Sequence, residues 1–179
     1  MGLPESSLDL LRNLARKPGH DEVKAYFLEL LVQEFGADRA SLRFEKRQPE
    51  ICGRLDALIG RTVFEAKRDL DRELPDVLRR MPDYLADCER EHGEPFVGIA
   101  SDGYRWIVYE LAGGALSTIK ETTLDPDKGE QFLAWLDGIL ALKASLHPDA
   151  LTIRNELGPD SIAFKRVDRE LRALWDEVS

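Results

Sequence analysis

Two acidic residues and a lysine lie close together in the stretch RLDALIGRTVFEAKRDL. A two-residue turn at Gly60 and Arg61 would make this stretch a β-hairpin, because glycine suits the first position of a type II′ turn. That register pairs Asp56 with Glu65 across the two strands. Lys67 points to the same face as Glu65, because side chains alternate along a strand. The spacing therefore predicts two carboxylates and one ammonium on a single face of a hairpin.

Such a set of charges is suited to binding a divalent metal ion. Like charges opposed across a strand pair repel each other, and half-buried carboxylates respond by binding a proton or a cation. Two carboxylates whose Cβ atoms lie about 5 Å apart can share Mg²⁺ (or Mn²⁺), which prefers oxygen ligands. Lys67 would then orient a metal-bound water or stabilise charge on a phosphate. This combination predicts phosphodiester hydrolysis.

A solvated strand face, on which Lys67 merely screens Glu65, is the simpler alternative, since Glu-x-Lys is a common tripeptide. Three features favour the site. Asp56 falls in register with Glu65, the strand TVFEAK is apolar before its acid, and the preceding helix offers Glu22 and Glu29 beside its apolar stripe. The opposite hairpin face is expected to belong to the core and consists of Leu55, Ala57, Ile59, Phe64 and Ala66.

Composition limits the class of protein. The chain has 179 residues, of which 43% are hydrophobic and 33% charged, as expected for one soluble globular domain. The net charge of −9 argues against a tight non-specific nucleic-acid binder. However, residues 39–90 hold 12 basic and 11 acidic residues, against 13 and 23 elsewhere, so any polyanion contact should lie near the hairpin. The sequence has no long apolar run and no CxxC pair, and we expect a cytoplasmic protein without membrane contact.

Hydrophobic periodicity indicates alternating helices and strands. The clearest helix is 21–35, with Asp21 as its N-cap and Gly36 as its end, and a shorter helix capped by Ser6 or Ser7 precedes it. A later helix runs from about Leu74, with Pro75 in its first turn and a kink at Pro82. Strands are expected at 40–45, 54–59, 62–67, 95–100, 104–111 and 115–122, and further helices at 130–144, 148–157 and 160–178.

This order predicts an α/β (α+β) fold with a mixed central sheet flanked by helices. Residues 1–125 would form the core, and residues 126–179 a helical extension that packs on it or links to a further domain.

The stretch GRLDALIGRTVFEAKRDL resembles the catalytic core of the PD-(D/E)XK nuclease superfamily, most closely the amino-terminal nuclease domains fused to restriction–modification enzymes. The resemblance covers about residues 20–110 and implies a restriction-endonuclease-like fold. It also implies that Asp56, Glu65 and the Ala66 carbonyl bind the metal and that Lys67 is catalytic. The helix DEVKAYFLELLVQEFGA matches the helix that supplies a further glutamate, here Glu22.

The sequence departs from that pattern at two places. Leu55 stands where the superfamily name has proline, and Arg80 stands where some branches have the glutamine of Gln-x-x-x-Tyr, although Tyr84 is kept. Arg68, Arg80 and Tyr84 are the expected nucleic-acid contacts. Dispersed arginines on solvated faces are the commoner case.

The resemblance implies a Mg²⁺-dependent deoxyribonuclease of a restriction–modification or defence system. Recognition, methylation or translocation would come from a methyltransferase, helicase or specificity domain or subunit. The alternative is a non-catalytic module of the same fold that binds DNA or a protein. A nuclease acting on RNA or branched DNA would differ only in its substrate.

Overall fold

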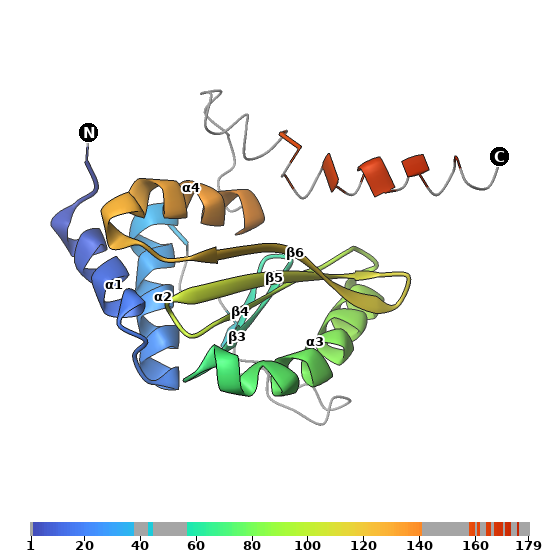
Figure 1. The fold of residues 1–179 in the computed structure, drawn as a ribbon, viewed down its shortest axis with the longest axis horizontal. Coiled ribbons are helices and arrows are strands. Elements are labelled where there is room, and N and C mark those ends of the chain that lie inside the picture. Colours follow the sequence, from blue (N-terminus) through green and yellow to red (C-terminus); the bar gives the residue numbers. More distant parts are fainter. Residues whose placement is uncertain are drawn as a thin grey trace.

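Six strands form one mixed sheet in the computed structural model, in the order β1-β2-β3-β4-β5-β6 (Figure 1). The structure describes residues 2–37, 43–44, 57–140, 158–159, 161, 164–165, 167–169, 171–172 and 175. Neighbouring strands are antiparallel except for β3 and β4, which are parallel and are connected through helix α3. The strands are β1 (Arg43–Phe44), β2 (Ala57–Ile59), β3 (Thr62–Ala66), β4 (Val97–Ser101), β5 (Arg105–Ala112) and β6 (Ala115–Thr123).

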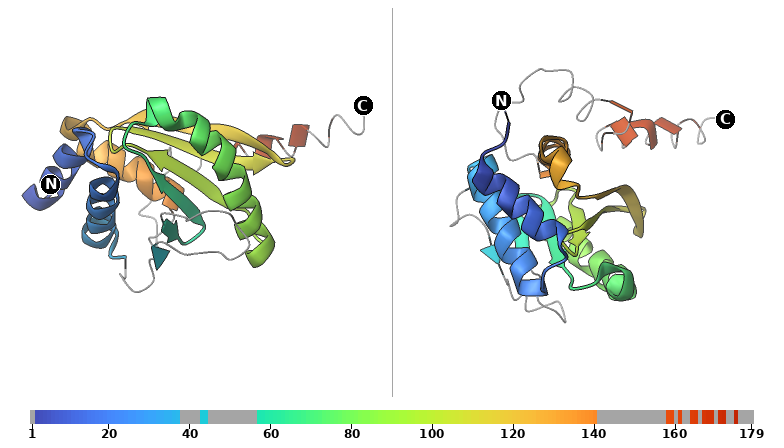
Figure 2. Two further views of the ribbon diagram at one scale, coloured as in Figure 1. Left: turned by 90° about the horizontal axis from the view of Figure 1, so that it is seen from below. Right: turned by 60° about the vertical axis from the view of Figure 1, so that its left-hand side comes forward.

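Helices cover both faces of the sheet (Figure 2). On one face, Phe64 and Trp106 of the sheet pack with Phe27 and Phe132 from the helices of that side. On the other face, α3 packs against the sheet through a second apolar cluster. The predicted mixed sheet flanked by helices is confirmed, and the helices are α1 (Glu5–Ala15), α2 (His20–Phe35), α3 (Leu70–His92), the 3₁₀ turn η1 (Pro126–Lys128) and α4 (Gly129–Leu140).

The first two helices begin earlier than the sequence predicts. Pro4 is the N-cap of α1, so Ser6 and Ser7 lie inside the helix, and the Ser7 hydroxyl donates to Glu34 of α2 instead. Gly19 replaces Asp21 as the N-cap of α2, because the Glu22 side chain already accepts from the Gly19 amide at 2.8 Å. A capping carboxylate at the third helical position satisfies an amide that the helix cannot.

The prediction for the start of α3 was wrong, while the end of α2 is as expected. Gly36 ends α2 with a left-handed φ of 62°. Helix α3 begins at Leu70, because Asp69 caps it by accepting from the Arg72 amide at 3.3 Å. Pro75 therefore lies beyond the first turn, and the helix continues through Pro82 with a bent axis (Figure 1).

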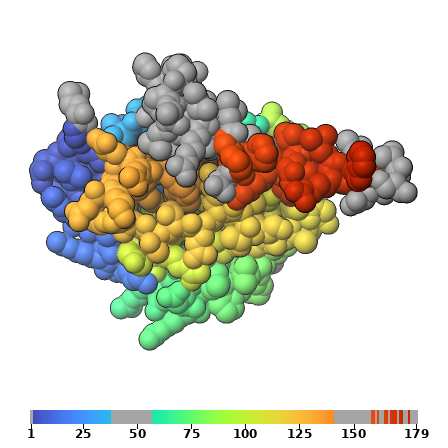
Figure 3. Space-filling model, turned by 45° about the horizontal axis from the view of Figure 1, so that its top comes forward, coloured from blue at the N-terminus to red at the C-terminus, as the bar shows by residue number. Residues whose placement is uncertain are grey.

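The C-terminal part of the chain is described at scattered residues, and these lie beside β5 and β6 (Figure 3). Lys165 donates to the Ile119 carbonyl at 2.9 Å, and Arg169 forms an ion pair with the buried Glu110. The predicted helix 148–157 and the strand residues 40–42 and 45 lie outside the described residues. Within the described ranges, no helix has both the length and the apolarity that a membrane span requires.

Candidate active site at the end of strand β3

The hairpin has the register that its sequence predicts. β2 and β3 pair Ala57 with Phe64, and Ile59 with Thr62. Gly60 has a φ of 56°, the positive value that the first position of a II′ turn requires. The described members of the predicted core face are all buried in the cluster on the α1 and α2 side: Ala57, Ile59, Phe64 and Ala66. Asp56 and Leu55 lie outside the described residues.

Glu65 and Lys67 lie on the opposite side of the sheet, beneath α3. Their relative exposures are 3% and 6%, so both charged groups are withdrawn from bulk water. The Lys67 ammonium donates to Glu65 Oε1 at 2.9 Å. Burying an ion pair is expensive, since each charge loses its hydration and regains only part of that energy from its partner. The sequence alternative of a solvated strand face therefore does not describe Glu65 and Lys67.

Asp76 of α3 is a second acid at the same ammonium. Its Oδ2 accepts from Lys67 Nζ at 2.9 Å, so Lys67 bridges a strand carboxylate and a helix carboxylate. The other oxygen of Asp76 faces Arg79 and, at 3.1 Å, Arg80. The site is therefore a network of alternating charges between β3 and α3.

This network shifts the pKa values of its members. Burial alone would lower the pKa of Lys67, but hydrogen bonds to Glu65 and Asp76 outweigh it and raise that pKa above its ordinary value. The hydrogen bond from Lys67 lowers the pKa of Asp76, with Arg79 adding to the effect and burial opposing it. Both groups are consequently charged across the neutral range.

Arg80 and Tyr84 extend the network along α3. They share a side-chain hydrogen bond, and the negative charge of Glu65 acts on both. Burial, and after it the charge of Glu65, raises the pKa of the Tyr84 hydroxyl. The structure therefore brings Arg80 and Tyr84, both predicted from the sequence, into the surroundings of Glu65.

Three other predicted site residues have different surroundings. Glu22 is exposed and caps α2. Arg68 is exposed, and its amide donates to Glu73 at 3.0 Å in the turn before α3. Ala66 is buried and pairs with Ser101 of β4. Ala66 lies between Glu65 and Lys67 and Arg68 directly follows Lys67, whereas Glu22 caps another helix.

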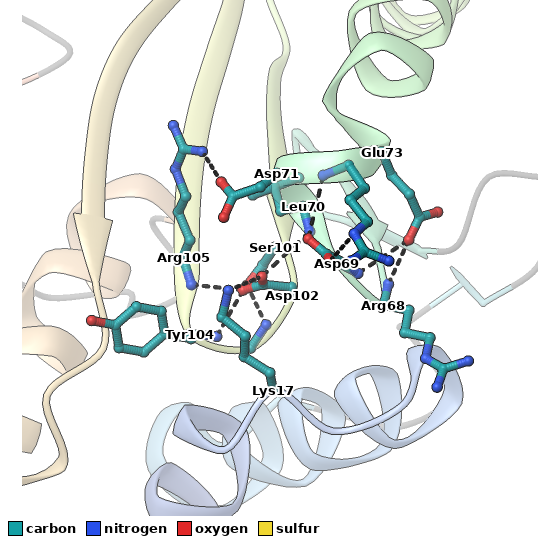
Figure 4. Close-up of polar contacts among 12 residues, drawn as sticks. Lys17, Arg68, Asp69, Leu70, Asp71, Glu73, Ser101, Asp102, Tyr104 and Arg105 are labelled. Carbon is teal, nitrogen blue, oxygen red and sulfur yellow. Dashed lines mark hydrogen bonds and ion pairs between the residues drawn. The ribbon is translucent and has the colours of Figure 1, made fainter.

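The buried carboxylate of Asp102, next to the site, connects the end of β4 to the start of α3 (Figure 4). Asp102 is fully buried, and its oxygens accept from the amides of Leu70, Tyr104 and Arg105 at 3.3, 3.1 and 2.8 Å. Lys17, in the loop between α1 and α2, lies 3.0 Å from the same carboxylate. Asp102 thus joins three parts of the chain that are distant in sequence.

The donors at the site are of the kind that Mg²⁺ prefers. Glu65 supplies a carboxylate and Ala66 a backbone carbonyl, and both are hard oxygen ligands. Among the residues that the structure describes, no group of three or more acidic, histidine or cysteine side chains could hold a metal ion. Asp56, the predicted second carboxylate, lies outside the described residues, so the metal site stays a prediction.

Sequence reasoning missed both Asp76 and Asp102 as members of the site. Asp76 is one of many charged residues in RDLDRELPDVLRRMPDY, and no local pattern separates it from the others. The apolar residues on both sides of Ser101-Asp102-Gly103 gave the available signal for Asp102, since a carboxylate between two buried strands needs partners.

Comparison of the chain with protein-family models, curated proteins and solved structures found no match.

Proposed function

We propose that this protein is a metal-dependent DNA endonuclease of the PD-(D/E)XK type, acting in the cytoplasm in a restriction–modification or defence system. The observation that carries the proposal is the buried Glu65–Lys67 pair at the end of β3. Buried charged side chains that the fold does not need for its stability are concentrated at functional sites. The hairpin register and the neighbouring Tyr84 add support, because they follow the order of motifs in the resembled superfamily.

In this proposal, Asp56, Glu65 and the Ala66 carbonyl hold a divalent ion. When bound, such an ion neutralises phosphate charge and lowers the pKa of a water molecule. Lys67 stays protonated and donates toward the attacking water or the phosphate oxygen beside it. Glu65 orients Lys67 through the 2.9 Å hydrogen bond, and α3 excludes bulk water from the pair.

The net negative charge of the chain indicates that further components contribute to DNA binding. With a net charge of −9, it has little general attraction for a polyanion. A methyltransferase, helicase or specificity domain or subunit would supply recognition and most of the phosphate contacts. Arg68 and Arg80, near the β3 end, are the proposed contacts of this chain.

A non-catalytic module of the same fold is the second candidate. It is favoured by the two ion pairs of Lys67, which satisfy the ammonium within the protein. It is also favoured by Arg80 in the position where some relatives of the resembled superfamily have glutamine. In this alternative the buried network holds α3 on the sheet and catalyses nothing.

A plasmid-nicking assay with Mg²⁺ or Mn²⁺ separates the two candidates. We expect the parent to nick supercoiled DNA, and Asp56→Ala, Glu65→Gln and Lys67→Ala each to slow nicking by at least about 100-fold. Lys128→Ala, which removes an exposed ammonium from η1, is the matched control and should leave the rate unchanged. Single-stranded RNA and branched DNA, offered as separate substrates, determine the substrate class. Nicking that survives all three site substitutions would refute the nuclease proposal.

A further inference from the structure

Lys67 has two acidic partners, and they differ in their surroundings. Glu65 is an almost completely buried strand residue, while the Asp76 side chain is 32% exposed at the edge of α3. Both accept from the same ammonium at 2.9 Å. A lysine that needed only a counter-ion would be satisfied by one carboxylate, so the second one calls for a physical reason.

The two oxygens of Asp76 are divided between different cations. Oδ2 accepts from Lys67, and Oδ1 faces Arg79 and Arg80. A carboxylate surrounded by three positive side chains is a poor ligand for a divalent cation, because the cation would have to approach against their repulsion. Asp76 is therefore suited to holding Lys67 and unsuited to binding metal.

Glu65 is in the opposite situation. In the proposed function it is a metal ligand, and a cation bound to it competes with Lys67 for its negative charge. A buried ammonium that loses its only carboxylate is strongly destabilised and would turn away or lose its proton. Because Asp76 also accepts from the Lys67 ammonium, the ammonium keeps one carboxylate partner while Glu65 binds the cation.

We propose that Asp76 is a positioning residue, which holds the Lys67 ammonium at the end of β3 independently of Glu65. Arg79 and Arg80 support this role by orienting the Asp76 carboxylate and keeping it ionised. The inference rests on the proposed nuclease function for its purpose, but the contact it describes is a property of the protein alone.

The first measurement needs no catalytic activity. In protein labelled with ¹⁵N-lysine, the ammonium of a buried, ion-paired lysine exchanges its protons slowly and gives a resolved ¹H–¹⁵N signal. The signal of Lys67 is assigned by its loss in Lys67→Arg. We expect it to persist in Glu65→Gln, in which Asp76 alone holds the ammonium, and to disappear when Glu65→Gln is combined with Asp76→Asn. Loss of the signal in Glu65→Gln would overturn the inference, as would its persistence in the double variant.

The second measurement is the nicking rate. Asp76→Asn should lower the rate by about 10- to 100-fold, as for other residues that orient a reactive group, and Asp76→Glu should restore most of it. Asp83→Asn, which removes an exposed acid from the same helix, is the control and should leave the rate unchanged. An Asp76→Asn protein that nicks as fast as the parent overturns the positioning role. If the parent itself does not nick DNA, the proposed function fails, and the lysine signal alone decides whether Asp76 holds Lys67.

Discussion

The backbone amide of Lys67 donates to the carbonyl of Ser101 at 2.8 Å. This bond continues the parallel pairing of β3 and β4 by one residue, so the two strands end at the same edge of the sheet. Lys67, the candidate catalytic lysine, therefore lies directly after the parallel pair of strands. The next residue after Ser101 is Asp102, whose carboxylate holds the start of α3 through the Leu70 amide. The position of Asp76 over Lys67 thus depends on contacts made at the end of β4.

The first prediction concerns the buried carboxylate of Asp102. Asp102→Ala should lower the free energy of unfolding by about 3 kcal/mol, because three backbone amides and Lys17 lose their acceptor. Lys17→Ala should cost about 1 kcal/mol or less, since the Lys17 side chain is 39% exposed and its ion pair is screened by water. Urea denaturation measures both values. Equal losses in the two variants would contradict the view that the amide contacts dominate.

A second prediction concerns the contact between β4 and α3. A Cβ atom on Gly98 would lie 2.4 Å from Met81 Sδ and 3.0 Å from Met81 Cγ, and Met81 is buried. Gly98→Ala should therefore destabilise the fold by about 1–3 kcal/mol through overpacking. Met81→Ala alone should cost about 2–5 kcal/mol by leaving a cavity. The double variant should lose less than the sum of the two, and strict additivity in thermal or urea denaturation would show that Gly98 and Met81 are not in contact.

The third prediction concerns alkaline pH. Burial raises the pKa of Tyr109 to about 12, so the folded protein holds this hydroxyl neutral where the unfolded chain has lost the proton. The raised pKa contributes to the free energy of unfolding. This contribution is fully present below the pKa of tyrosine in the unfolded chain, near 10, and is lost as pH rises toward 12. The loss should amount to about 2–3 kcal/mol. In Tyr109→Phe, the difference in unfolding free energy from the parent should shift in favour of the variant over this interval. If the difference in unfolding free energy between Tyr109→Phe and the parent is the same at pH 9 and at pH 12, burial does not keep the Tyr109 hydroxyl neutral. A pKa raised by about two units must change that difference over this interval.

The hairpin could be predicted from local sequence because its determinants are local. Alternation of apolar residues fixes which face is buried, and Gly60 supplies the positive φ that the turn needs. The same reasoning placed Glu65 and Lys67 together on one face, and they are in contact. The pairing of Asp56, which lies outside the described residues, stays a prediction.

The start of α3 and the second acidic partner of Lys67, Asp76, could not be found in the same way. The first turn of α3 is stabilised by the Asp69 cap and by Glu73, which accepts from the Arg68 and Asp69 amides, and these contacts have no apolar period. Which acid of α3 reaches Lys67 depends on how the helix lies across the sheet. That placement is determined by long-range contacts such as the one between Asp102 and Leu70.

The last prediction asks whether the buried charges of Glu65 and Lys67 are kept for stability. Lys67→Met alone should cost about 3–5 kcal/mol, because it leaves the Glu65 carboxylate buried without its ammonium. Glu65→Leu combined with Lys67→Met replaces the pair by apolar side chains of similar size between β3 and α3. Such replacements are often neutral or stabilising, so the double variant should unfold at the same denaturant concentration as the parent or a higher one.

The comparison of that double variant with the parent separates a functional pair from a structural one. A stable double variant that binds no Mg²⁺ and nicks no DNA, beside an active parent, would mean that the two charges are retained for chemistry at the expense of stability. A double variant destabilised as much as Lys67→Met alone would mean that the network of Glu65, Lys67 and Asp76 stabilises the packing of α3, which is what the non-catalytic alternative requires. Calorimetric titration with Mg²⁺ and urea denaturation of the same preparations provide the two readings.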